Sequence, residues 1–143
     1  MPTAGRTAGV NHTTRMKKMA VDGIVVSVIT GTNTGGVSIL KVSGYLDTTT
    51  AGELETALYG LLDRSMYKVV VDLAGVNYIS SAGWGIFIGE IKRIRNHGGD
   101  LKLCGMVGDV HEVFQLLEFH SILEAYPTSQ EAVAAFKSKD AAA

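Results

Sequence analysis

Short apolar runs and longer stretches of helical periodicity alternate along the 143 residues of this chain. Two runs rich in β-branched side chains, 24–30 and 37–42, flank a glycine-rich segment, which predicts a β-hairpin with a flexible loop at 31–36. Three more strands are expected at 68–73, 101–104 and 122–125. Apolar residues recur at spacings of three and four in four further segments, which predict helices over 50–63, 82–96, 110–119 and 129–137.

The alternation of strands and helices defines the fold class. Such an order needs crossover connections, and these produce a mainly parallel sheet. We therefore expect one α/β domain over residues 23–138. It should contain a mixed, mainly parallel sheet of about four or five strands, an N-terminal hairpin and about four helices mostly on one face.

The two ends of the chain lack this patterning. Residues 1–22 contain four basic residues and one acid but no periodic apolar face, so we expect them to be a disordered tail that folding does not need. Residues 139–143 are expected to form a second short tail. The four scattered positive charges are explained by solvation alone.

The apolar stripes of two helices predict which of their side chains are buried. In the helix over 110–119, we expect Val113, Phe114, Leu116 and Leu117 to face the core. In the helix over 82–96, Ile86 falls outside the stripe. It is either an exposed contact for a partner or an incidental surface isoleucine.

The stretch from Asp72 to Gly85, DLAGVNYISSAGWG, contains the main candidate site. It reads as the end of a strand, a loop and the start of a helix. Ser80 and Ser81 lie where an N-cap residue belongs, and a helix that begins at Ala82 would make Ser81 the N-cap. The free amides and the dipole at such a helix start favour an anion, so a serine there is well placed to carry a phosphate.

The other helices begin differently. Thr50 has Glu53 three residues later, Asp109 has Glu112 and Thr128 has Glu131, and each pair resembles a capping box that places a carboxylate in the first turn. The serine helix has Trp84 at that position, so no acid competes with an incoming anion. An unmodified serine cap, with Gly83 and Gly85 allowing close packing, explains the same residues equally well.

The serine stretch, together with GYLD at Gly44–Asp47 and the order of elements, resembles the STAS domain family, and in particular the bacterial anti-sigma factor antagonists. The resemblance covers roughly residues 22–138. It implies a switch rather than an enzyme: a serine at this helix start is phosphorylated by a partner kinase that is also the anti-sigma factor and has a histidine-kinase-like fold. A metal-dependent serine phosphatase removes the phosphate. Asp47 resembles the aspartate that the family places beside this serine, although a turn or cap role explains it as well.

The sequence departs from the family at the acceptor position. Many antagonists have the phosphorylated hydroxyl residue directly before the first glycine, and that position is Ala82 here. Either Ser81, one position earlier, is the acceptor, with Ser80 as the alternative, or phosphorylation has been lost. Trp84 replaces the usual leucine, as a core substitution or as an exposed contact. The expected partner-binding residues are Asp47, Ser80, Ser81, Ala82, Gly83, Trp84, Gly85 and Ile86.

The composition of the chain argues against several other classes of function. The formal net charge of −1 gives no reason to expect nucleic-acid binding, and no apolar run reaches 18 residues, so we expect neither membrane insertion nor a secretory signal and predict a cytoplasmic protein. Cys104 is the only cysteine, and the four histidines lack the spacing of a metal site. We expect no catalytic residues, no metal and no cofactor.

Two hypotheses about function follow. The first is an anti-sigma factor antagonist, a phosphorylation-controlled module that binds the anti-sigma factor kinase and thereby releases a sigma factor. The second is a STAS domain that is not phosphorylated and serves as a scaffold or binds a small ligand, with the serines acting only as caps.

Overall fold

A mixed β-sheet organises the part of the chain that the computed structural model describes, residues 14–31 and 35–142. Six strands occur in these residues: β2 (Thr14–Val21), β3 (Ile24–Gly31), β4 (Ser38–Leu46), β5 (Lys68–Ile79), β6 (Asp100–Cys104) and β7 (Glu124–Tyr126). The helices are α1 (Ala51–Asp63), α2 (Ser81–Asn96), α3 (Gly108–Leu116), the 3-10 helix η3 (Phe119–Ser121) and α4 (Ser129–Ala142).

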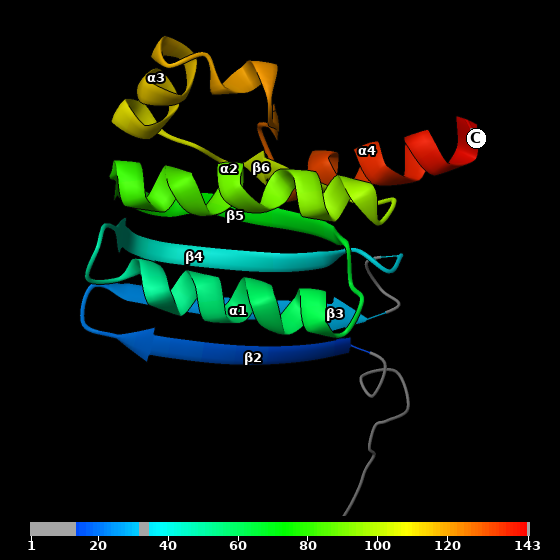
Figure 1. Cartoon of the computed structure of the whole chain (residues 1–143), viewed down its shortest axis with the longest axis horizontal. Helices are drawn as coiled ribbons and strands as arrows, with labels where there is room; N and C mark the ends of the chain where they lie inside the picture. The colour runs from blue at the N-terminus through cyan, green and yellow to red at the C-terminus, as the bar shows by residue number, and fades with distance from the viewer. Residues whose placement is uncertain (1–13, 32–34, 143) are drawn as a thin grey trace, which may run out of the picture.

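The strands lie in the sheet in the same order as in the sequence, β2-β3-β4-β5-β6-β7 (Figure 1). The pairs β2–β3 and β3–β4 are antiparallel, whereas β4, β5, β6 and β7 are mutually parallel. The expected mixed, mainly parallel sheet with an N-terminal hairpin is therefore confirmed. It has six strands rather than four or five.

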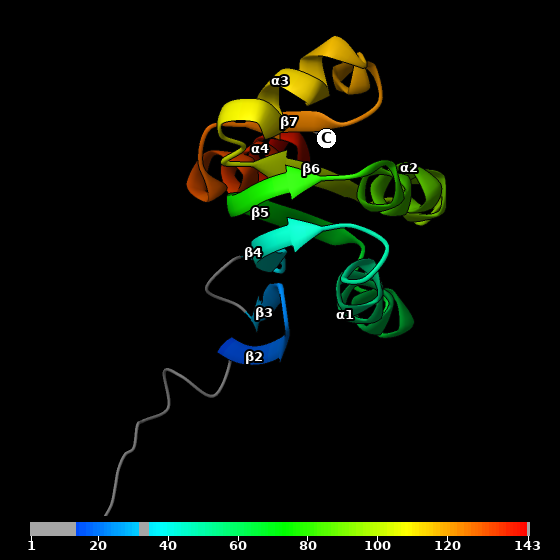
Figure 2. The same ribbon diagram turned by 90° about the vertical axis from the view of Figure 1, so that its left-hand side faces the viewer.

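The two faces of the sheet are covered unequally. Along β5, Val69 and Val71 belong to the larger buried cluster, to which α1, α2 and α3 contribute. Val70 points to the other face, where Ala132 and Phe136 of α4 cover it in a smaller cluster. Figure 2 shows α1 and α2 on one side of the sheet and α4 on the other. The helices thus lie mostly on one face, as expected.

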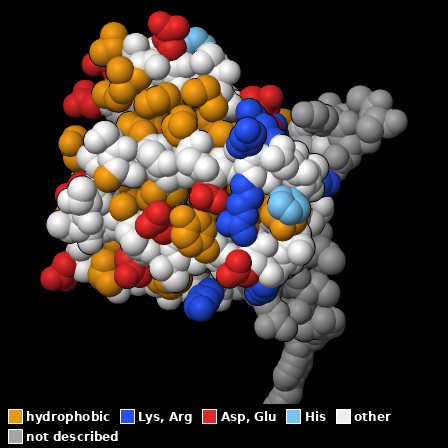
Figure 3. All heavy atoms as spheres, viewed as in Figure 1, with side chains coloured by type: hydrophobic (Ala, Val, Ile, Leu, Met, Phe, Trp, Pro, Cys, Tyr) orange, Lys and Arg blue, Asp and Glu red, His pale blue; other side chains and the backbone are white. Residues whose placement is uncertain are grey.

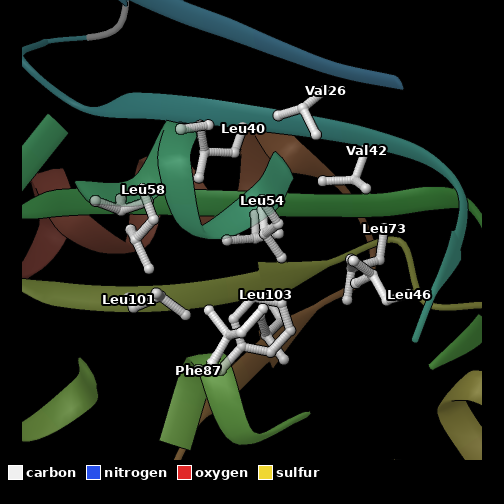
Figure 4. Close-up of a cluster of buried hydrophobic side chains, with 14 of the residues drawn as sticks. Val26, Leu40, Val42, Leu46, Leu54, Leu58, Leu73, Phe87, Leu101 and Leu103 are labelled. Carbon is white, nitrogen blue, oxygen red and sulfur yellow. The ribbon is translucent and has the colours of Figure 1, made fainter. Parts of the chain in front are cut away.

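The larger cluster is the main core, and Figure 4 shows its centre. Leu54 and Leu58 of α1 and Phe87 of α2 point toward sheet residues such as Leu40 and Leu103, and all five side chains are buried. Each fully buried side chain of this size contributes roughly 1.5–3 kcal/mol relative to its exposed state. This layer holds α1 and α2 side by side, and their first turns meet the same end of the sheet.

The expectation of disordered tails at both ends is wrong for the residues that the structure describes. Residues 14–21 form β2, and each of them pairs with β3, from Thr14 opposite Gly31 to Val21 opposite Ile24. At the other end, α4 continues through residues 139–142. The alternation that marks a strand is weak in β2 because it is an edge strand, where charged side chains such as Lys17 and Lys18 are common. Residues 1–13 and 143 lie outside the described residues.

The expected apolar stripe of α3 is also partly wrong. Val110 and Phe114, one helical turn apart, are the residues that α3 buries. Leu116 and Leu117 are 77% and 55% exposed, because the helix ends at Leu116 and the chain turns away there. The segment to Phe119 therefore does not form one continuous helix.

Candidate functional site

Strand β5 leads directly into the candidate site. The loop expected between Asp72 and Ser80 is instead the second half of β5, which ends at Ile79, so only Ser80 separates the strand from α2. The register between β4 and β5 shifts twice, between Lys41 and Ser43 and between Gly44 and Tyr45. These irregularities break the period-two pattern, which is why the sequence indicated a loop.

The ends of the two central parallel strands meet at the site. Leu46, the last residue of β4, lies opposite Ile79, the last residue of β5. The backbone N–H of Ser80 then donates a hydrogen bond of 2.8 Å to the Leu46 carbonyl oxygen. The turn after β4 and the start of α2 are thereby held next to each other, as the family resemblance implied.

Asp47 organises the turn after β4. Its carboxylate oxygen Oδ1 accepts hydrogen bonds from the Thr49 hydroxyl (2.6 Å) and the Thr49 N–H (2.7 Å). These bonds, the hydroxyl foremost, hold the pKa of the Asp47 carboxyl below its usual value. Its carbonyl oxygen accepts the N–H of Ala51 (2.9 Å), so Asp47 also fixes the start of α1. Asp47 is therefore an ionised turn residue beside the serines.

Ser80, rather than Ser81, is the N-cap of α2. Its backbone is extended (φ −83°, ψ 175°), its carbonyl oxygen accepts the first helical hydrogen bond from Trp84 N–H at 3.0 Å, and Ser81 is the first helical residue. The expected start at Ala82 with Ser81 as the cap is one residue too late. The sequence left this open because two adjacent serines satisfy the cap preference equally well.

The two serine hydroxyls have opposite environments. The Ser80 Oγ atom is buried and has no hydrogen-bond partner among the residues described, and it makes no capping bond to the helix. The Ser81 side chain is exposed at the first turn. That turn contains no acidic residue, so the unpaired N–H groups at the helix start face no carboxylate of their own helix. An anion on Ser81 would lie in a favourable field.

The two glycines that flank Trp84 have different roles. A Cβ atom on Gly83 would lie 2.7 Å from Ile79 Cγ2 and 2.9 Å from Leu46 Cβ, so the helix can pack on the strand ends only with glycine here. A Cβ on Gly85 would meet no heavy atom within 4 Å, and this residue is exposed. Gly83 therefore sets the position of α2, whereas Gly85 leaves the first turns uncovered.

Trp84 is a core residue and not an exposed contact. Its ring is buried and lies 4.9 Å from the ring of Phe119, 6.0 Å from that of Phe114 and 6.2 Å from that of Phe87, between ring centroids. The indole Nε1 has no hydrogen-bond partner in the described part of the chain. This aromatic cluster docks α3 and η3 against the first turns of α2.

Ile86 is buried, so neither of the surface roles expected for it is correct. It is only 6% exposed and belongs to the main core. Helix α1 lies beside α2 and contacts it, so the buried arc of α2 is wider than a stripe that faces only the sheet (Figure 2). Of the eight expected partner-binding residues, Gly83, Trp84 and Ile86 are buried, while Ser81 and Gly85 are exposed and Asp47, Ser80 and Ala82 are intermediate.

Apolar side chains that sequence reasoning did not assign to the site lie near it. Tyr78, two residues before Ser80, is 55% exposed, and Leu116 and Leu117 are exposed where the helix that Trp84 holds against α2 ends. Figure 3 shows hydrophobic side chains gathered over α3 at the upper left of this face. The sequence gave no signal for Tyr78, because the register shifts interrupt the alternation of β5, and the two leucines were expected to face the core.

Neither a side-chain cluster that could hold a metal ion nor a helix that could span a membrane occurs among the residues that the structure describes. Within them, no group of three or more histidine, cysteine or acidic side chains is arranged to hold a metal ion. None of the helices in the described ranges is long and apolar enough to cross a membrane.

Comparison with known proteins assigns the chain to a family. The sequence model of the STAS domain matches residues 29–132. BtrV of Bordetella bronchiseptica, whose name describes it as a candidate anti-sigma factor antagonist, is 35% identical over 102 residues, which cover 71% of this chain and 88% of BtrV. The chain belongs to the STAS domain family, as the resemblance predicted.

Solved structures agree with this assignment. An anti-sigma factor antagonist from Mycobacterium paratuberculosis superposes with a TM-score of 0.71 at 27% identity, over 81% of this chain and 96% of that one. The Bacillus cell fate determinant SpoIIAA in its phosphorylated form has a TM-score of 0.56 at 13% identity, over 85% of this chain and 99% of SpoIIAA, which shows a shared fold.

Proposed function

We propose that this protein is an anti-sigma factor antagonist whose binding to its partner is controlled by phosphorylation of Ser81. The observation that carries the proposal is the contrast between the neighbouring serines: Ser81 is exposed at the start of α2, whereas the Ser80 hydroxyl is buried. A kinase must reach the hydroxyl that it modifies. Ser81 is therefore the acceptor, and Ser80 forms part of the helix start.

The comparisons support the binding role. BtrV, which carries the antagonist description, is similar to this chain over most of its own length, and the Mycobacterium paratuberculosis antagonist has the same fold. SpoIIAA has been determined in a phosphorylated form, which supports phosphate as the means of control in this fold. The proposed partners are an anti-sigma factor that is a serine kinase of histidine-kinase-like fold and a metal-dependent serine phosphatase. No catalytic step is assigned to this chain.

A phosphate on Ser81 would change the charge and hydration of the binding surface without changing the fold. It adds about −1.5 to −2 charges at pH 7, and free N–H groups of the first turn are available to it. The helix dipole favours that charge, so α2 should not unwind. A partner that buries Ala82, Gly85 or the nearby Tyr78 would have to desolvate the phosphate, which is costly without a matched cation. Phosphorylation would thus release the partner.

The alternative is a STAS scaffold without phosphorylation. The feature in its favour is Ala82, which occupies the position where many family members carry the acceptor hydroxyl. Under this alternative, Ser81 is an ordinary residue of the first turn, and its replacement would leave partner binding unchanged in the presence of ATP.

Alanine variants of the two serines distinguish the phosphorylation-controlled antagonist from the scaffold without phosphorylation. With a serine kinase of the anti-sigma type and ATP, the wild type and Ser80→Ala should lose kinase binding over time, whereas Ser81→Ala should stay bound. Both variants should remain folded, because neither serine makes a side-chain capping bond in α2. Ser81→Asp should weaken binding in part, since one carboxylate imitates a phosphate incompletely. If the wild type and Ser81→Ala both stay bound in the presence of ATP, the scaffold is favoured, and if both are released, Ser81 is not the acceptor.

A further inference from the structure

An open groove lies between strand β2 and helix α1, away from the serines. Its volume is about 530 Å³, within the usual range for small-molecule sites. It is lined by the second half of α1 with its C-cap Arg64, by Met16, Lys17 and Met19 of β2, and by Val28 and Thr30 near the end of β3. In Figure 1 these segments lie on the right, whereas α2 begins at the left end of the molecule. The β2–α1 groove is therefore separate from the proposed phosphorylation site.

The groove exists because β2 extends the sheet beyond the helix that covers it. Lys17 and Met19 pair with Val28 and Val26 and so share the face that α1 covers. On the helix side, Gly60 presents no side chain, and a Cβ there would meet no heavy atom within 4 Å. The space left open is bordered by apolar atoms of Met19, Val28 and Leu61.

Two cationic side chains also line the groove. Lys17 and Arg64 both line it, and neither forms an ion pair with any residue in the described ranges. Arg64 is the C-cap of α1, and the one polar contact of its guanidinium within the described residues is with the sulfur of Met66 (3.4 Å). Among the described residues, no acidic side chain lines the groove.

Thr30 supplies a hydrogen-bonding group to the same groove. Its hydroxyl has no hydrogen-bond partner within residues 14–31 and 35–142, and it is not sealed from solvent, since Ser80 Oγ and Trp84 Nε1 are the buried side-chain polar atoms there that lack a partner. The hydroxyl can therefore donate a hydrogen bond to an acceptor that enters the groove. Thr30 belongs to the end of β3, which is beside the start of β2 and the end of α1.

We propose that the β2–α1 groove binds a fatty carboxylate. The carboxylate group is held by Lys17, Arg64 and the Thr30 hydroxyl, and the aliphatic chain lies along Met19, Val28 and Leu61. Two cations without acidic neighbours favour an anion, and the apolar walls favour an aliphatic body over a compact ion. This inference does not depend on the phosphorylation of Ser81.

Calorimetric titration of the full chain with decanoate tests the proposal. Decanoate should bind saturably below its micelle concentration, whereas acetate and decanol, which lack the aliphatic chain and the charge respectively, should bind at least about tenfold more weakly. Decyl phosphate that binds while decanoate does not would overturn the choice of a carboxylate. An absence of saturable binding of both decanoate and decyl phosphate would overturn the site itself.

Two pairs of matched variants test whether decanoate binds in the β2–α1 groove. Gly60→Leu fills the groove and should weaken decanoate binding by about tenfold or more, because the aliphatic chain loses its space. Gly52→Leu is the control, since Gly52 lies two turns earlier on α1, is also unobstructed and does not line the groove. Lys17→Gln should weaken binding and Lys18→Gln should not. Circular dichroism checks that each variant is folded, and equal affinity of the folded Gly60 and Gly52 variants would contradict the proposal.

Discussion

The N–H of Ser80 donates its hydrogen bond to the carbonyl oxygen of Leu46, which joins the ends of β4 and β5 at the residue where α2 begins. The bond is between backbone groups, and the Ser80 side chain makes no capping bond. The strands, rather than the serine hydroxyls, therefore position the helix start. The start of α2 should therefore keep its position when the serine hydroxyls are removed. It should not keep it when the close contact between the helix and the strand ends is changed.

Gly83→Ala tests that contact. The added methyl would lie 2.7 Å from Ile79 Cγ2, so we expect a loss of about 1–3 kcal/mol in the free energy of unfolding, typical of overpacking. Gly85→Ala in the same helix is the control. It has open space and should stabilise the protein by about 0.5–1 kcal/mol through helix propensity. Urea unfolding measures both, and equal midpoints would refute the packing argument.

Thr49→Ala should raise the pKa of Asp47, because the Thr49 hydroxyl is the main group that lowers it. In the folded protein this pKa lies below the unfolded value of about 3.9, so the stabilisation is complete above that value. It is lost as the pH falls through the folded pKa. NMR titration of the Asp47 carboxyl carbon measures the shift. Thr48→Ala is the matched control, and an unchanged pKa in Thr49→Ala would show that the turn is arranged differently.

Removal of β2 should destabilise the fold, contrary to the expectation of a dispensable tail. A chain that starts at Asp22 loses the strand pairing with β3 and the packing of Met19 on the core. We expect a loss of about 2 kcal/mol or more, comparable with one buried methionine side chain. A chain that starts at Thr14 keeps β2 and is the control. If both truncated chains unfold at the same urea concentration, β2 contributes nothing to stability.

Cys104 should be inert in the folded protein. Burial raises the pKa of its thiol to about 12, with a smaller contribution from the charge of Asp72. Ellman's reagent at pH 8 should therefore react with native protein far more slowly than with protein in urea. Cys104 is the only cysteine, so the signal has one source. Rapid stoichiometric reaction without urea would show that the thiol is accessible.

The sequence predicted the elements whose apolar patterns are strong. Helix α1 begins and ends within one residue of the expected 50–63, and the family resemblance correctly placed the turn after β4 beside the serines. β2 was missed because an edge strand rich in lysine has little alternation. The end of β5 was missed because two register shifts interrupt its pattern.

The start of α2 and the turn after β4 lie next to each other as predicted, but the burial of the side chains around them was not predicted correctly. Ile86 is buried because α1 packs beside α2, and a helical wheel of α2 alone does not contain that neighbour. Leu116 and Leu117 are exposed because α3 ends earlier than its apolar residues indicated. The choice between two adjacent serines depends on a backbone angle and on burial, which the sequence of residue types does not determine.

The central claim is that Ser81 is the phosphorylated residue. Its most direct test is mass spectrometry of the protein after incubation with ATP and an anti-sigma factor kinase that binds it. We expect one phosphate on Ser81, retained in Ser80→Ala and absent in Ser81→Ala. A phosphate on Ser80, or none on either serine despite binding of the kinase, would contradict it.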